Sequence, residues 1–222
     1  MGPPVRFFVG NEKLAEGGIW SMSDVVYCLN VFRREKQLRE TIDKVNEMFN
    51  SPPIYVASNG IQTMSDLTSN VTFNWFGSNQ GWQLGALNGC CQALRMAAEH
   101  EIELRGKAII FSHDDVYPAN VNRISELIEQ IGQYDLVCRK YVGPHEQPHK
   151  YPYIMIESII LSPRVLPLFL DIPKFDCLPH HCAEMSFGKI ATDLNFNILS
   201  LDVDRGSECE ENETGFYHDH KH

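Results

Sequence analysis

The sequence predicts an α/β fold with a mostly parallel sheet and helices on both faces, and two observations lead to this prediction. Short apolar runs, typical of buried strands, alternate with longer stretches in which apolar residues recur at helical spacing. One such run, Ile109-Ile110-Phe111, stops abruptly at His113, Asp114 and Asp115. Strands that end this way deliver acids to a cleft at the carboxyl edge of an α/β sheet, although an Asp in a polar turn can also simply cap the next helix.

The first half of the chain supplies four strands and two helices. Apolar runs mark the strands, and Pro52-Pro53 ends the first helix because proline cannot continue it. The second strand breaks at Ser58-Asn59-Gly60, which is a turn signature. The expected strands are 24–29, 54–57, 71–75 and 107–112, and the expected helices are 35–49 and 81–100.

The second half repeats the alternation with shorter elements. A loop rich in Gly, Pro and His is expected over 143–152, and the acidic stretch 202–215 has almost nothing to bury, so it should be mobile. The expected helices are 120–131, 163–169 and 182–194, and the expected strands are 134–142, 153–161 and 197–201.

The 222 residues are most simply a single domain, 1–222, with an N-terminal extension at 1–22 and an acidic loop and His-rich tail at 202–222. The 19 basic and 29 acidic residues give a formal charge of −10, which argues against a nucleic-acid partner. No apolar run is long enough for a transmembrane segment. Seven cysteines without regular disulfide spacing favour a reducing compartment, so a cytoplasmic location is expected.

Five ordered segments resemble the nucleotide-sugar glycosyltransferases of the GT-A fold, close to the family-2-type inverting group. They are VVYCLNVFRR at 25–34, IYVASNG at 54–60, NQGWQLGALNGCCQA at 79–93, the acidic turn at 111–115 and AEMSF at 183–187. The resemblance covers roughly Asp24 to Asp202. It implies a GT-A fold, a Rossmann-like arrangement, and transfer of a sugar from a nucleoside diphosphate sugar to a hydroxyl of a glycan or related acceptor.

The resemblance places a divalent cation, Mn²⁺ or Mg²⁺, at the acidic turn. Asp115 matches the last acid of the family's metal motif, and late His residues serve as metal ligands in some GT-A enzymes, which suggests His218. Asp114 stands at the variable middle position, so it would face the sugar or ribose. His113 replaces the first acid of the motif, and a neutral His there can still donate a hydrogen bond. For His218, a disordered tail is the competing interpretation.

Four further positions are expected at the nucleotide sugar. Asn30 follows the first strand and can approach the nucleotide through its backbone. Asn59 stands where related enzymes bind the base, although an Asn before Gly60 is also an ordinary turn residue. Gly81 and Gly85 would allow the backbone to come close to the ligand. Arg33 and Arg34 either contact phosphate or lie exposed at a helix start, and exposure is favoured.

The catalytic base for an inverting reaction would be a carboxylate that removes a proton from the acceptor hydroxyl. Glu184 resembles that acid, although Met185 follows it where the family usually has a second acid. A Glu favoured by the helix dipole is the alternative. Glu157 interrupts an apolar run, so it needs a partner, a cleft or an exposed edge, and it is the second candidate.

The sequence thus predicts a metal-dependent glycosyltransferase, expected to be inverting. One alternative is a retaining transferase of the same fold. Another is a non-catalytic nucleotide- or glycan-binding module on a degenerate transferase fold, which His113 and Met185 favour. A nucleotidyltransferase would need a Gly- and Arg/Lys-rich loop after the first strand, where this chain has Leu29-Asn30-Val31-Phe32.

Overall fold

A computed structural model describes residues 25–77, 82–100, 107–142, 152–171, 182–203 and 210–219. Its main sheet has seven strands among these residues, in the order β10-β6-β9-β4-β1-β2-β3. All neighbouring pairs are parallel except those of β9, which runs antiparallel to both β4 and β6. The strands are β1 (Val25–Val31), β2 (Ile54–Ser58), β3 (Val71–Trp75), β4 (Ala108–His113), β6 (Leu136–Cys138), β9 (Ser158–Leu161) and β10 (Ile198–Ser200).

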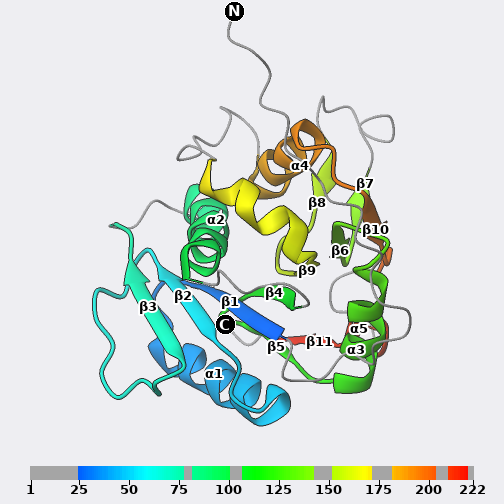
Figure 1. The fold of residues 1–222 in the computed structure, drawn as a ribbon. Coiled ribbons are helices and arrows are strands. Elements are labelled where there is room, and N and C mark those ends of the chain that lie inside the picture. Colours follow the sequence, from blue (N-terminus) through cyan, green and yellow to red (C-terminus); the bar gives the residue numbers. More distant parts are fainter. Residues whose placement is uncertain are drawn as a thin grey trace, which may run out of the picture.

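Helices cover both faces of this sheet (Figure 1). On one face lie α1 (Glu35–Phe49) and α3 (Val121–Gln130), and on the other lie α2 (Trp82–His100), the 3-10 helix η1 (Pro163–Leu170) and α4 (Ala183–Asp193). Successive side chains of β1 enter opposite cores, with Tyr27 facing α1 and Cys28 facing α2. None of the helices described combines the length and apolar content that a membrane span requires.

Two small antiparallel pairs complete the described structure. β7 (Tyr141–Val142) pairs with β8 (Tyr153–Ile154), and β5 (Val116–Pro118) pairs with β11 (Phe216–His218). A short helix, α5 (Glu210–Thr214), leads into β11. The turn between them is made at Gly215, whose φ of +80° favours glycine. The β5–β11 pair therefore brings the late part of the chain next to the end of β4.

The structure confirms the α/β class and most elements, but two expected strands are wrong. The apolar run at 134–142 is divided into β6 and β7, and the run at 153–161 is divided into β8 and β9. The breaks fall at Arg139 and at Glu157, which are both buried and form an ion pair with each other. Each expected strand is thus interrupted where one partner of this buried ion pair lies.

The expectation that the acidic stretch has almost nothing to bury is wrong for its last third. Residues 210–214 form a helix in which Glu210 and Thr214 are buried. Thr214 Oγ1 donates a hydrogen bond to the Glu210 carbonyl oxygen at 2.6 Å. Hydrophobicity alone could not reveal this burial, because a charged partner in another part of the chain makes it possible. Mobility of the stretch stays a prediction.

Candidate active site

The site forms where the strand order changes direction. From β1 the chain proceeds outward to β2 and β3, and then returns to place β4 on the other side of β1. In α/β sheets, ligands bind outside the carboxyl ends of the strands at such a switch point. Here Asn30 of β1 lies beside His113 of β4, and the Asp114 amide donates to the Asn30 carbonyl oxygen at 3.1 Å.

Asp115 is one of two buried acids in this turn, and Arg34 and His218 face it. Arg34, the residue before α1, donates from Nη1 to Asp115 Oδ2 at 2.8 Å. His218 Nε2 lies 3.6 Å from the same oxygen. Burial by itself would raise the pKa of Asp115, but the contacts with His218 and Arg34 outweigh it and hold the pKa well below its usual range. Asp115 is therefore a carboxylate at neutral pH.

His218 reaches Asp115 because strand β11 pairs with strand β5. His218 is paired with Val116 in this ladder, and the Asp219 amide donates to the Asp115 carbonyl oxygen at 2.9 Å. The side chain is only 2% exposed. The late histidine proposed from the sequence is thus next to the acidic turn, 103 positions later in the chain than Asp115.

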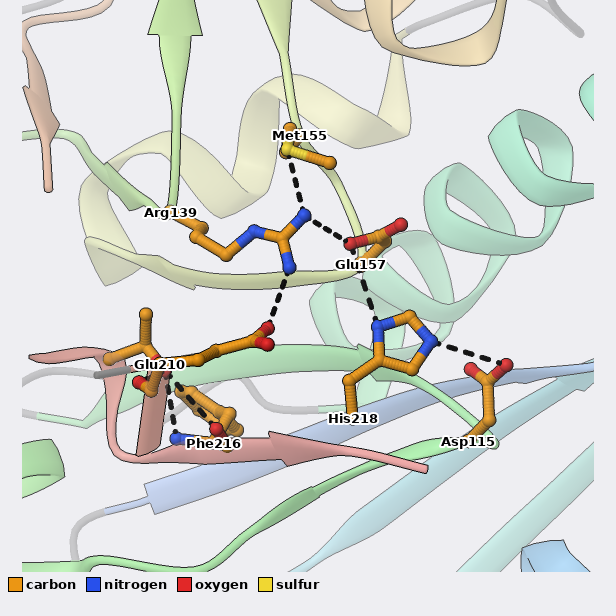
Figure 2. Close-up of polar contacts among 8 residues, drawn as sticks. Asp115, Arg139, Met155, Glu157, Glu210, Phe216 and His218 are labelled. Atoms are coloured by element: carbon orange, nitrogen blue, oxygen red, sulfur yellow. Dashed lines mark hydrogen bonds and ion pairs between the residues drawn. The ribbon is translucent and has the colours of Figure 1, made fainter. Parts of the chain in front are cut away.

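A buried line of charges continues beyond His218 (Figure 2). His218 Nδ1 lies 3.7 Å from Glu157 Oε2, and Arg139 Nη2 lies 2.8 Å from that same oxygen. Arg139 also donates from Nη1 to Glu210 Oε1 at 2.6 Å. Glu157 was proposed as a second base, but its carboxylate is already engaged by a guanidinium.

Asn30 lies in β1 and Asn59 follows β2, and both side chains press against helix α2. A Cβ added to Gly85 would be 1.9 Å from Asn59 Nδ2, and one added to Gly89 would be 2.0 Å from Asn30 Oδ1. Both side chains are buried, and neither Oδ1 has a hydrogen-bond partner among the described residues. Gly85 therefore makes room for the Asn59 side chain. This packing role differs from the close approach to a ligand that was expected for Gly85. Gly81 lies outside the described residues.

His113 and Asp114 bring two more buried polar groups to this edge. Burial lowers the pKa of His113, while the negative charges of Asp115, Glu157 and Glu184 oppose that shift. Burial, and then the charge of Asp115, raises the pKa of Asp114 to about 7. His113 Nε2 and Asp114 Oδ2 have no hydrogen-bond partner among the described residues. Such orphaned atoms are suited to bind a polar ligand.

Glu184 lies in the first turn of α4, as expected, and is half-buried. Burial raises the pKa of Tyr153 above its usual range, and the charge of Glu184 adds to this shift. Ser186, on the same helix turn, has a buried Oγ with no hydrogen-bond partner in the described chain. Glu184 is thus close enough to the site for its charge to act on His113.

A divalent cation at this turn would need oxygen or nitrogen ligands from nearby side chains. No group of three His, Cys, Asp or Glu side chains among the described residues is arranged to hold a metal. Asp115 and His218 supply one oxygen and one nitrogen donor, which suit Mn²⁺. A cation that also binds phosphates commonly takes only one or two side chains from the protein. The residues present therefore fit a cation that shares its ligands with a diphosphate.

Arg139 and Glu210 are buried site residues that were not expected from the sequence, and Arg34 was expected either at a phosphate or exposed. Arg34 is an inward-facing partner of Asp115, although exposure was favoured for it. Arg139 offered a signal, because it interrupts an apolar run just as Glu157 does, and two buried opposite charges are expected to pair. Nothing in the acidic sequence around Glu210 distinguishes it from its neighbours.

No protein-family profile matches the chain, and no curated protein matches it in sequence. Among solved structures, the galactosyltransferase LgtC in complex with donor and acceptor sugar analogs aligns with a TM-score of 0.50 at 8% identity, covering 86% of each chain. The chain resembles the nucleotide-sugar transferases and shares their GT-A fold.

Two other solved structures align at lower TM-scores. The bifunctional IspDF from Campylobacter jejuni gives 0.47 at 14% identity, over 81% of this chain and 50% of that one, so the chain spans half of its length. A glycosyltransferase involved in glycosylation of the major capsid of PBCV-1 gives 0.46 at 12% identity, over 89% of this chain and 96% of that one.

Proposed function

We propose that this protein is a glycosyltransferase that transfers a sugar from a nucleoside diphosphate sugar to a hydroxyl of a glycan or related acceptor. One observation carries the proposal: Asp115 and His218, far apart in sequence, meet at the switch point between β1 and β4. Around them lie buried polar atoms of Asn30, Asn59 and Asp114 that have no partner among the described residues. The shared fold supports the same conclusion.

Asp115 and His218 are the proposed ligands of Mn²⁺ or Mg²⁺. When bound, the cation would neutralise negative charge on the leaving diphosphate. Arg34 holds the Asp115 carboxylate in place and brings a positive charge to the same edge. Because its side chain is 33% exposed, Arg34 can also reach a phosphate bound at this edge.

The donor would lie along the edge formed by Asn30, Asn59 and His113. A side-chain amide offers both a donor and an acceptor, which suits recognition of a base or ribose. Asp114, whose pKa is raised to about 7, can donate or accept near neutral pH and is assigned to the sugar or ribose.

Glu184 is the preferred base. It is half-buried, and general bases need a carboxylate that can reach the acceptor hydroxyl. Glu157 is less suited to this role because its carboxylate is already paired with the buried Arg139. In the inverting reaction, Glu184 takes the hydroxyl proton as the acceptor oxygen attacks the anomeric carbon and the diphosphate leaves.

Calorimetric binding of UDP, GDP, dTDP and CMP tests the proposal, with and without Mn²⁺. We expect one nucleotide to bind in a Mn²⁺-dependent manner, with Asp115→Ala abolishing the binding. Asp193→Ala is the matched control, because Asp193 is an acid at the far end of α4 that pairs with Lys189. The absence of binding to all four, with or without Mn²⁺, would refute the donor site.

A non-catalytic nucleotide- or glycan-binding module is the second candidate. It is favoured by the neutralisation of Asp115 by Arg34, which reduces the need for a cation, and by Met185 beside Glu184. Slow hydrolysis of the donor with Mn²⁺, lost in Glu184→Gln while binding is retained, would rule out this module. The anomeric configuration of the product, read by NMR, distinguishes inverting from retaining transfer.

A further inference from the structure

We propose that Tyr153 contacts the acceptor of the reaction and that this acceptor is a neutral glycan. One sugar unit would lie against the ring and hydroxyl of Tyr153 beside Glu184, where the surrounding negative charges disfavour an acceptor that carries phosphate. The proposal rests on the proposed function and narrows it. Because the base must reach the acceptor hydroxyl, the side chains next to Glu184 lie where the acceptor binds.

The contact between β8 and α4 brings Tyr153 next to Glu184. The two elements lie side by side (Figure 1). A Cβ added to Gly188 would be 2.0 Å from the Pro152 carbonyl oxygen, so glycine lets the residue before β8 come this close to the helix. Glu184 lies about one helical turn before Gly188 and therefore on the same face of α4. Tyr153, which follows Pro152, is thus carried to that face near Glu184.

The Tyr153 side chain lies on the side of its strand that faces away from the core. Its neighbour Ile154 is fully buried in the core on the α2 side of the sheet, whereas Tyr153 is half-buried. Successive side chains of a strand point to opposite faces. Val142, the partner of Tyr153 in the β7–β8 ladder, is half-buried as well. Part of the phenol is therefore open to a ligand.

The Tyr153 hydroxyl is close enough to several charged groups to be influenced by them. Burial raises the pKa of this hydroxyl above its usual range, the charges of Glu184 and Glu157 add to the rise, and the charge of Arg139 opposes it. Tyr153 is therefore near both the preferred base and the buried Arg139–Glu157 pair. Its hydroxyl keeps the proton at neutral pH, so it can donate a hydrogen bond to a sugar oxygen.

The charges on this side of the site favour a neutral acceptor. Among the described residues, Glu184 and Glu157 are opposed by Arg139, whose single positive charge is shared with Glu210. A phosphate placed here would meet a net negative charge, and buried charges are only weakly screened by salt. A neutral sugar avoids this repulsion. Its apolar C–H faces and its hydroxyls match a tyrosine, which has an apolar ring and a polar tip.

An array of neutral oligosaccharides, printed beside the same glycans carrying a phosphate monoester, tests the acceptor class with the full chain. The array is run with and without Mn²⁺ and each nucleotide of the binding test, and we expect the neutral forms to bind more tightly. Calorimetry with the best neutral glycan should show an affinity about 10–100-fold lower in Tyr153→Ala, which loses both ring and hydroxyl. Tyr153→Phe, which keeps the ring, should lose about 2–10-fold.

Transfer kinetics with the same glycan give the second readout. We expect Tyr153→Ala to raise KM for the acceptor, whereas Glu184→Gln should lower kcat. Tyr134→Ala is the matched control, because Tyr134 is also half-buried but lies before β6, at the amino ends of the parallel strands. Circular dichroism checks that each variant folds, and Tyr153→Phe serves alone if Tyr153→Ala does not.

Equal or tighter binding of the phosphorylated glycans, no binding to any neutral glycan, or an affinity unchanged in the folded Tyr153 variants would overturn the proposal. Any of these results, obtained with a protein that binds a nucleotide through Asp115, would leave the proposed function standing. Neutral-glycan binding that depends on Tyr153, in a protein that binds no nucleotide, would uphold the glycan contact and refute the transferase.

Discussion

Replacing Gly85 by alanine tests whether the Asn59 amide is lodged against helix α2. In a helix interior, Gly→Ala ordinarily stabilises a protein by about 1 kcal/mol. Here the new Cβ would be 1.9 Å from Asn59 Nδ2, well inside the distance of about 3.5 Å at which such atoms make contact. Asn59 is 3% exposed, so it has little space into which to move.

Overpacking of this kind costs about 1–3 kcal/mol. Because the contact is severe, we take the upper part of this range and subtract the helical gain, which leaves a net loss of about 1–2 kcal/mol in the free energy of unfolding. For a chain of this size, that loss lowers Tm by about 2–8 °C. Thermal unfolding followed by circular dichroism measures it.

A double-mutant cycle identifies the cause. Asn59→Ala removes the atoms that the new methyl group would meet, so the double variant Asn59→Ala/Gly85→Ala should be more stable than the sum of the single effects predicts, by about 1–3 kcal/mol. Gly132→Ala is the control, because an added Cβ there meets nothing within 4 Å. A Gly85→Ala protein at least as stable as the wild type, or strictly additive effects, would refute the reasoning.

Two other variants probe the turns at either side of the site. In the folded protein the pKa of Asp114 is raised to about 7, so this group adds to the free energy of unfolding below its unfolded pKa and loses that contribution as the pH rises through 7. The wild type should therefore lose stability between about pH 4 and pH 7, and Asp114→Asn should lose less over the same range. Urea unfolding across this window measures the fall, and identical slopes for both proteins would contradict it. Gly215→Ala places a side chain at φ +80° with its Cβ 2.4 Å from Ile124 Cγ1, so it should cost about 1–2 kcal/mol and weaken any Mn²⁺ binding through His218. Unchanged Tm and unchanged Mn²⁺ affinity would show that β11 does not depend on this turn.

The sequence predicted the elements whose signal is local. The helix 35–49 matches α1 because Leu38, Ile42 and Val45 recur at helical spacing and all three are buried. The strand before the acidic turn is β4, which is central in the sheet and apolar from Ala108 to Phe111. Of the site residues, Asp115 and His218 were both proposed from the sequence, and the structure brings them within 3.6 Å.

Features that depend on distant partners could not be predicted. The antiparallel β9 follows from which strands it pairs with, and an apolar run carries no information about direction. In the sequence, Arg34 at a helix start cannot be told from an exposed arginine. Its partner Asp115 lies 81 residues later in the chain, and only the fold brings the two side chains together. The same holds for Gly85, whose neighbour Asn59 lies on another element.

The pairing of β11 with β5 has a consequence for when activity can arise during synthesis. A chain that has emerged from the ribosome as far as β10 carries the whole main sheet and Asp115, but it lacks Glu210 and His218. Arg139 and Glu157 would then be paired with each other beside an acidic turn that has no histidine. The nascent protein is therefore expected to fold its main sheet first and to bring His218 next to Asp115 only when β11 is released.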